Sequence, residues 1–136
     1  MAIEELSIRV EKVTQSRLNE VDFNALKFGR EFSDHMLIAE YDNGVWSQPS
    51  IQPYGKLAFA PASSVFHYGQ AIFEGMKAYR SVNDEILMFR PDANLKRFNR
   101  SAVRMSMAEV PEHIFMDGIK ALIELDKDWV PKGEGQ

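Results

Sequence analysis

The sequence contains no cysteine among its 136 residues. Disulfides, thiolate chemistry and cysteine-ligated zinc are therefore excluded, and the chain does not need an oxidising compartment. Its first residues, MAIEELSIRVEK, carry glutamates where a secretory signal would carry basic residues. No segment approaches the run of about 18 apolar residues that a membrane-spanning helix requires. We therefore expect a cytoplasmic protein without a membrane partner.

Several catalytic signatures are also missing. There is no GxSxG motif, no phosphate-binding GxxxxGK[ST] motif and no GxGxxG motif after a strand. His35, His67 and His113 lack the mutual spacing of a metal site, and no nearby carboxylates complete one. The formal net charge of −4 argues against a nucleic-acid partner, which usually binds a basic surface. These patterns predict neither a metal site nor nucleic-acid binding.

The composition is that of a folded domain, with 45% hydrophobic and 26% charged residues. A chain of this length fits one domain. We predict an α+β fold, in which a small antiparallel or mixed β-sheet is packed by two main helices. We assign residues 1–131 to this domain and residues 132–136 to the start of a linker.

The first half of the chain predicts mainly strands and loops. Alternation of apolar and polar residues favours a strand over residues 6–13, followed by connecting backbone over residues 14–30. Asn43-Gly44 between two apolar runs predicts a β-hairpin formed by residues 35–41 and 45–48. Pro53 and Gly55 suggest a loop over residues 51–59, with a short edge strand at its end, Leu57-Ala58-Phe59.

The second half predicts the helices. A serine hydroxyl in Pro61-Ala62-Ser63-Ser64 is expected to cap a short helix over residues 65–72. Residues 76–80 and 86–90 predict a second hairpin. Apolar spacing then predicts a helix over residues 92–105, and a second helix that begins at Pro111-Glu112 and ends near Trp129-Val130-Pro131.

Arg97, Arg100 and Arg104 fall at positions i, i+3 and i+7 of the first long helix, so they share one face. Such a face is commonly solvated. However, the guanidinium fork suits bidentate capture of phosphate or carboxylate, and apolar residues alternate with these arginines. Together with the Gly- and aromatic-rich turn upstream, this face suggests a pocket in residues 65–105 for a small anionic, partly apolar molecule.

Two groups in that turn have more than one interpretation. His67 and Tyr68 supply a titratable ring and a phenol that suit a ligand pocket, although such residues are more often structural. Glu74 beside Gly75 is either a buried acid or the partner of an arginine, and the spacing favours neither.

The segments HYGQAIFEGMKAY (67–79), LMFRPDANLKRFNRSAVRMSM (87–107) and LIELDKDWVP (122–131) closely resemble the branched-chain amino acid aminotransferases. Those enzymes are fold-type IV proteins that use pyridoxal 5′-phosphate. The similarity also includes KFGREFSDHMLIAEY (27–41) and IQPYGKLAFAPASS (51–64). It thus runs from about Leu26 to Pro131, which corresponds to the N-terminal domain of that family.

The resemblance implies a role for each matching residue. Arg97 matches the arginine that holds the phosphate of pyridoxal 5′-phosphate. Phe28, Tyr68 and Phe73 match aromatic residues of the apolar pocket for leucine, isoleucine and valine, part of which is supplied across a homodimer interface. Gly75 and Lys77 follow on the strand beside that pocket. The resemblance gives Arg100 and Arg104 no pocket role.

The resemblance also implies that a second domain is absent. In the family, that domain carries the lysine that covalently holds the cofactor and moves the proton at the substrate Cα. None of the eight lysines here lies in a similar motif (Lys12, Lys27, Lys56, Lys77, Lys96, Lys120, Lys127 and Lys132). We therefore expect a fragment that contains no catalytic residue and transfers no amino groups alone, from a parent enzyme acting on branched-chain amino acids and 2-oxoglutarate.

Two other interpretations remain open. The parent enzyme could be a different fold-type IV protein, such as a D-amino acid transaminase or lyase, which shares a looser motif core. Alternatively, the chain could be a free-standing domain that binds anions or a protein partner without catalysis. Exposed apolar faces favour the second interpretation for the isolated chain, since such patches promote association.

Overall fold

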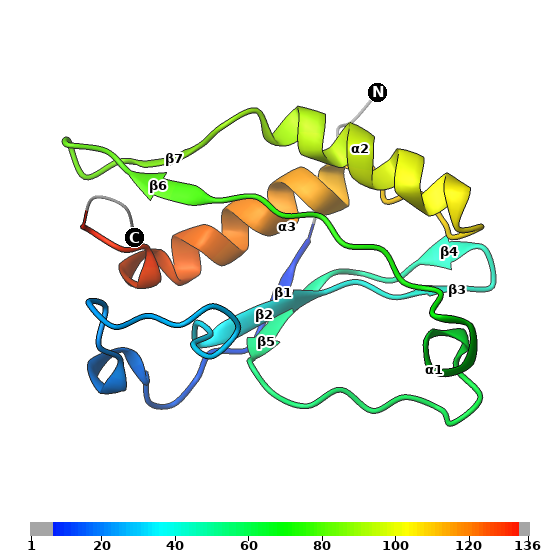
Figure 1. The fold of residues 1–136 in the computed structure, drawn as a ribbon, viewed down its shortest axis with the longest axis horizontal. Coiled ribbons are helices and arrows are strands. Elements are labelled where there is room, and N and C mark those ends of the chain that lie inside the picture. The colour runs from blue at the N-terminus through cyan, green and yellow to red at the C-terminus, as the bar shows by residue number, and fades with distance from the viewer. Residues whose placement is uncertain (1–6, 134–136) are drawn as a thin grey trace.

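The computed structural model describes residues 7–133 of the chain. Short strands dominate its first half and two long helices its second, as Figure 1 shows. The elements are, in order, β1 (Arg9–Val10), the 3₁₀ helix η1 (Leu18–Glu20), β2 (His35–Ile38), β3 (Tyr41–Asp42), β4 (Val45–Trp46), β5 (Ser50–Pro53), α1 (Ser64–Tyr68), β6 (Ala78–Arg80), β7 (Ile86–Met88), α2 (Pro91–Arg104), α3 (Glu112–Leu125) and the 3₁₀ helix η2 (Lys127–Trp129).

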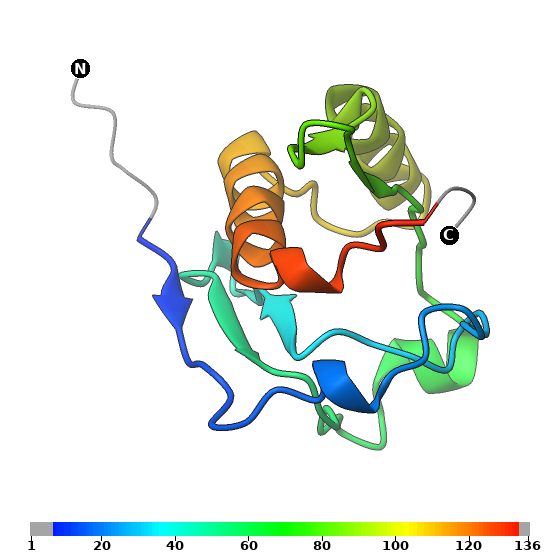
Figure 2. The ribbon, with the colours of Figure 1, turned by 90° about the vertical axis from the view of Figure 1, so that its left-hand side faces the viewer.

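A three-stranded mixed sheet forms the base of the molecule. Its strand order is β1-β5-β2, with β1 parallel and β2 antiparallel to β5. Leu37 pairs with Ile51, whose side chain is only 1% exposed. Helix α3 lies across one face of this sheet, and α2 packs on the far side of α3 (Figures 1 and 2). The predicted α+β fold is confirmed. Helix α3 packs directly on the sheet, and α2 packs on α3.

The prediction for residues 51–59 is wrong in two respects. No strand forms at Leu57-Ala58-Phe59, and residues 51–53, predicted to begin a loop, belong to the central strand β5 (Ser50–Pro53). Pro53 is tolerated there because β1 extends only to Ile51, so β5 is an edge at its last residue. The burial of Ile51 between β1 and β2 therefore outweighs the tendency of Pro53 to end a strand.

Both predicted hairpins are confirmed, with shorter strands. β3 and β4 flank Asn43-Gly44, whose φ angles of 49° and 86° are the positive values that such a turn requires. The preceding strand is interrupted, because β2 pairs with β5 while β3 pairs with β4. In the second hairpin, β6 pairs with β7 around a turn at residues 81–85.

Helices α2 and α3 are confirmed, and the bounds of α2 differ by one residue from those predicted. Pro91 is the first residue of α2, where a missing N–H costs no helical hydrogen bond. Leu95 and Ala102 are the buried residues of α2, and the rings of Phe98 and Phe115 join the two helices at 6.0 Å between centroids. Helix α3 ends at Leu125, earlier than predicted, and η2 continues the chain.

Three other predictions need correction or limitation. Helix α1 ends at Tyr68 instead of residue 72, because Gly69 adopts a left-handed conformation with φ of 60°. Ser63 precedes the helix, but its hydroxyl makes no capping hydrogen bond. The first strand includes only Arg9–Val10, and Leu6 lies outside the described residues. In the predicted connecting segment, η1 is accompanied by hydrogen-bonded turns at residues 22–25 and 27–30.

Candidate anion-binding site

The pair formed by Glu74 and Arg97 is the centre of the candidate site. Arg97 Nε donates to Glu74 Oε2 at 2.7 Å, and Arg97 Nη2 donates to Glu74 Oε1. The side chain of Glu74 is only 6% exposed, whereas that of Arg97 is 60% exposed. The sequence left two interpretations of Glu74 open, a buried acid or the partner of an arginine. Both are correct, because Glu74 is nearly buried and pairs with Arg97.

Two parts of the chain bring the pair together. Arg97 lies on α2, one helical turn after Asn94, so both side chains share one face of the helix. Glu74 lies on the irregular segment between α1 and β6, which runs along the molecule in Figure 1. Asn94 Nδ2 donates to Glu74 Oε1 at 2.9 Å and to the Gly75 carbonyl at 3.1 Å. Asn94 therefore fastens this segment to the helix.

The charges of the pair stabilise each other. Hydrogen bonds from Arg97 first, and from Asn94 second, lower the pKa of Glu74 from its ordinary 4.5 to about 2. The hydrogen bonds to Glu74 likewise raise the pKa of Arg97 above its ordinary value. Both groups are therefore charged at neutral pH.

Arg97 retains the donors to hold an additional anion. A guanidinium has five N–H groups, and Glu74 occupies two of them, which leaves three. Arg97 also lines a surface hollow of about 380 Å³ with Ala93, Asn94, Lys96 and Arg100. This donor set fits the phosphate of pyridoxal 5′-phosphate, because guanidinium binds phosphate through paired N–H donors.

The other basic side chains of α2 are held less firmly than that of Arg97. Lys96 lies 3.8 Å from Asp92 on the helix surface. Arg100 and Arg104 have no ion-pair or side-chain hydrogen-bond partner among residues 7–133. Helical spacing predicted that Arg97, Arg100 and Arg104 share one face of the helix. Of these three, Arg97 alone forms an ion pair with a carboxylate within residues 7–133.

The remaining predicted site residues are divided between two groups. Phe73 and Gly75 flank Glu74, and the Phe73 ring lies 3.6 Å from the position that a Gly75 Cβ would take. Lys77 follows, with its Nζ 5.4 Å from the centre of the Tyr79 ring. Phe73 is 85% exposed. These residues adjoin the pair and leave an aromatic ring accessible.

Phe28 and Tyr68 belong to two further segments, the loop before β2 and the end of α1. Phe28 is fully exposed in the loop before β2, and Tyr68 is 86% exposed at the end of α1. Figure 1 shows this loop and α1 well separated in the molecule. A shared aromatic pocket of Phe28, Tyr68 and Phe73 stays a prediction.

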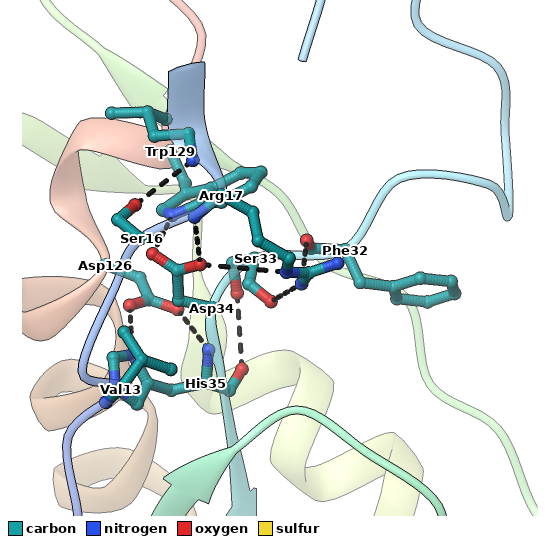
Figure 3. A network of polar contacts seen from close by, with 10 residues as sticks. Val13, Ser16, Arg17, Phe32, Ser33, Asp34, His35, Asp126 and Trp129 are labelled. Atoms are coloured by element: carbon teal, nitrogen blue, oxygen red, sulfur yellow. Dashed lines mark hydrogen bonds and ion pairs between the residues drawn. The ribbon is translucent and has the colours of Figure 1, made fainter. Parts of the chain in front are cut away.

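A second polar cluster lies where the N-terminal segment meets the end of α3 (Figure 3). His35 Nδ1 lies 2.6 Å from Asp126 Oδ1, and the His35 backbone N–H donates to Asp126 Oδ2 at 2.9 Å. The Val13 backbone N–H donates to His35 Nε2 at 3.0 Å. Since Nε2 accepts, the hydrogen of the neutral ring is on Nδ1 and points to Asp126.

Asp34 continues this cluster. Its carboxylate accepts from the Arg17 backbone N–H and from Trp129 Nε1, both at 3.0 Å. Burial alone would raise the pKa of Asp34, but hydrogen bonds from Arg17, Ser16 and Trp129, with the charge of Arg17, lower it overall. Within residues 7–133 every buried side-chain polar atom has a partner. The buried polar atoms of this cluster therefore serve to join the N-terminal segment, β2 and the end of α3.

Sequence reasoning did not identify Asn94 or the Asp34 and Asp126 clusters. Helical spacing places Asn94 on the same face as Arg97, which follows three residues later, but an amide on that face has no signature that indicates a role. The contact between His35 and Asp126 spans 91 residues, and no local pattern indicates it.

The described residues offer neither a metal-binding cluster nor a membrane-spanning helix. Residues 7–133 include no group of three or more side chains placed to hold a metal ion. The helices within the same range are too short or too polar to cross a membrane.

The sequence has close relatives among characterised proteins. Over 115 residues, or 84% of this chain, it is 50% identical to branched-chain-amino-acid transaminase 1 of Bacillus subtilis (strain 168). It is 45% identical over 131 residues to branched-chain-amino-acid aminotransferase 2 of the same organism, and 43% identical over 129 residues to a branched-chain-amino-acid aminotransferase of Monosiga brevicollis. These matches cover 95% and 94% of the chain.

The matches cover only part of each relative. They span 32%, 36% and 33% of the three proteins, so the chain spans about a third of the length of the curated relatives it matches. No protein-family model matches the chain.

Proposed function

Because the chain is homologous to the branched-chain-amino-acid aminotransferases, we propose that it forms part of an enzyme that transfers the amino group of leucine, isoleucine or valine to 2-oxoglutarate. The observation that carries this proposal is 43–50% identity over most of the chain to proteins with that name. The same names favour this parent over a D-amino acid transaminase or lyase. The geometry around Arg97 supports the proposal independently, because it leaves donors for an anion.

The proposed cofactor is pyridoxal 5′-phosphate, which stabilises negative charge at the substrate Cα and carries the amino group between substrates. In this proposal Arg97 binds its phosphate through the N–H groups that Glu74 leaves unoccupied. Phe73 and Gly75, next to Glu74 in the chain, adjoin this position and would contact the substrate side chain. Lys77 extends the same segment toward β6.

Phe28 and Tyr68 require a second copy of the protein under this proposal. Both side chains are almost fully exposed, and they lie in separate parts of the fold (Figure 1). A homodimer would allow an aromatic ring of one copy to complete the apolar pocket of the other. Exposed aromatic rings of this kind are typical of surfaces that become covered by a partner.

We further propose that these 136 residues alone do not complete the reaction. A transaminase needs a lysine that both anchors its cofactor and moves a proton. None of the eight lysines of this sequence lies in a motif similar to that of the family. The chain would then contribute a phosphate anchor and part of a side-chain pocket.

Activity and covalent trapping together test this proposal. The purified chain is incubated with pyridoxal 5′-phosphate, leucine and 2-oxoglutarate, glutamate is measured, and a parallel sample is reduced with borohydride for mass spectrometry. We expect no glutamate and no single lysine modified to stoichiometry. Turnover together with a stoichiometric adduct on Lys77 would contradict the proposed inactivity, and a Lys77→Arg variant would show whether that adduct was responsible.

A further inference from the structure

Glu74, which Asn94 also contacts, holds the guanidinium of Arg97 in a defined position. Although Arg97 is largely exposed, Glu74 is covered, and both of its carboxylate oxygens are occupied. Asn94 holds one of these oxygens and also the neighbouring Gly75 carbonyl. The carboxylate is therefore fixed from two directions before any ligand is present.

The contact engages one particular edge of the guanidinium. Glu74 accepts from Nε and Nη2, which lie along one side of the planar group. Because the guanidinium is rigid, two hydrogen bonds along one edge also fix the direction of the opposite edge, which carries Nη1. Nη1 has no hydrogen-bond partner among residues 7–133. The free edge therefore points in a direction that Glu74 determines.

We propose that Glu74 is a positioning residue that holds Arg97 side-on, so that the free edge of its guanidinium receives a phosphate group. This inference rests on the proposed function, in which that phosphate belongs to pyridoxal 5′-phosphate. A long arginine side chain loses conformational entropy when it binds an anion, and a group fixed beforehand loses less. Glu74 and Asn94 together supply that fixation.

Glu74 affects anion binding in two opposite ways: its hydrogen bonds position Arg97, but its negative charge repels an anion. The direction in which phosphate affinity changes when Glu74 is replaced therefore shows which effect is larger. A negative carboxylate beside Arg97 lowers the local positive potential and would weaken binding of any anion. If Glu74 mainly competed with the phosphate, its replacement by a neutral residue would strengthen phosphate binding. If it mainly positions Arg97, the same replacement weakens binding.

A suitable probe is pyridoxine 5′-phosphate, which carries the phosphate but has no aldehyde to react with surface lysines. Its affinity for the chain is measured by calorimetry with wild type, Glu74→Gln, Asn94→Ala and Arg97→Gln. Glu124→Gln is the matched control, because Glu124 is an exposed carboxylate paired with Lys127 at 3.1 Å. Circular dichroism establishes that each variant is folded.

We expect Glu74→Gln to weaken binding by roughly tenfold, the size associated with loss of one charge-assisted hydrogen bond. Asn94→Ala should weaken it less, because the direct contact between Glu74 and Arg97 remains. Glu124→Gln should leave it unchanged. If Glu74→Gln fails to fold, Asn94→Ala decides, and wild-type affinity in that variant contradicts the inference.

A second readout needs no ligand. The Arg97 Nε–H donates to Glu74, so its ¹⁵N-edited proton resonance should exchange slowly with water in wild type and in Glu124→Gln. It should exchange rapidly in Glu74→Ala, which removes both acceptor oxygens, whereas glutamine would keep one. A resonance equally slow in that variant would show that Glu74 does not orient the guanidinium, and would overturn the inference.

The outcomes separate this inference from the proposed function. If Arg97→Gln binds the probe as wild type does, Arg97 is not the phosphate anchor, and both proposals fail at that residue. If Arg97→Gln loses affinity while Glu74→Gln keeps or gains it, the anchor stands and the positioning role of Glu74 is contradicted.

Discussion

Glu74 lies in the irregular segment between α1 and β6, where its side chain is nearly buried and ion-paired with Arg97, 23 residues further along the chain. Hydrogen bonds from Arg97 and Asn94 hold its pKa at about 2. A carboxylate with this environment stabilises the folded state only while it is ionised.

This property predicts a pH-dependent effect of Glu74→Gln on stability. Because the pKa of Glu74 in the folded state is about 2, below its ordinary 4.5, its contribution is complete above about pH 4.5 and disappears as the pH falls toward 2. The difference in unfolding free energy between wild type and Glu74→Gln should therefore shrink over that interval. Urea unfolding at several pH values measures it, and a difference that stays constant down to pH 2 would contradict the assignment.

Single residues were predicted from the sequence only where a local rule applied. The three arginines of α2 were placed on one face by helical spacing, but spacing could not show which of them meets Glu74. That choice depends on the path of the segment between α1 and β6, which has no regular period. Asn94 was missed although the helix was predicted correctly, because an amide on a helix surface has no distinctive signature.

At the scale of elements, α3 packs on the sheet through an unusually close contact. Gly118 on α3 faces Leu37 on β2, and a Cβ at Gly118 would lie 2.7 Å from Leu37 Cδ2. Leu37 Cδ1 and Cγ lie 3.4 and 3.6 Å from the same point. A side chain at position 118 would therefore have to displace the end of the Leu37 side chain.

This contact predicts that Gly118→Ala destabilises the wild-type chain but stabilises a chain in which Leu37 is replaced by alanine. Gly118→Ala should destabilise the chain by about 1 kcal/mol, because overpacking costs about 1–3 kcal/mol and exceeds the gain in helix propensity. In a Leu37→Ala background the overlap is gone, and Gly118→Ala should stabilise the chain by about 1 kcal/mol, the propensity difference. Denaturant unfolding of the four proteins measures the coupling, and identical effects in both backgrounds would contradict it.

The polar cluster of Figure 3 connects elements from the two ends of the chain. Asp126, just after α3, receives two hydrogen bonds from His35 on β2. Asp126→Ala leaves both donors without partners in a buried place, and should cost on the order of 3 kcal/mol. The neighbouring Asp128 is exposed, so Asp128→Ala should cost less than about 1 kcal/mol. Thermal unfolding compares them, and equal losses would contradict a special role for Asp126.

Elements were predicted well where a local signal and tertiary packing agree. Asn43-Gly44 fixes its hairpin because the turn requires positive φ values, and the two long helices have clear apolar faces. β5 was missed because Pro53 indicates a loop, whereas its neighbours β1 and β2 make it a central strand. Pairing between strands that lie far apart in the sequence is invisible to local rules.

For the whole molecule, the fold provides a support for Arg97 and leaves several aromatic residues exposed. The chain aligns with about a third of each aminotransferase that it resembles. The roles that the resemblance gave to Arg97, Phe73 and Gly75 stay predictions, although Phe73 and Gly75 flank Glu74, the acid that pairs with Arg97. Phe28 and Tyr68 stay a prediction about an assembled enzyme, since nothing within residues 7–133 brings them to Arg97.

Calorimetric titration with pyridoxine 5′-phosphate tests whether this surface is a phosphate anchor. Wild type is compared with Arg97→Gln and with Arg104→Gln, a matched change at an exposed arginine of the same helix without a partner in residues 7–133. Pyridoxine without its phosphate is the ligand control. We expect Arg97→Gln alone to abolish the phosphate-dependent affinity. Equal affinity in wild type and Arg97→Gln, or equal losses in both variants, would contradict the assignment of Arg97.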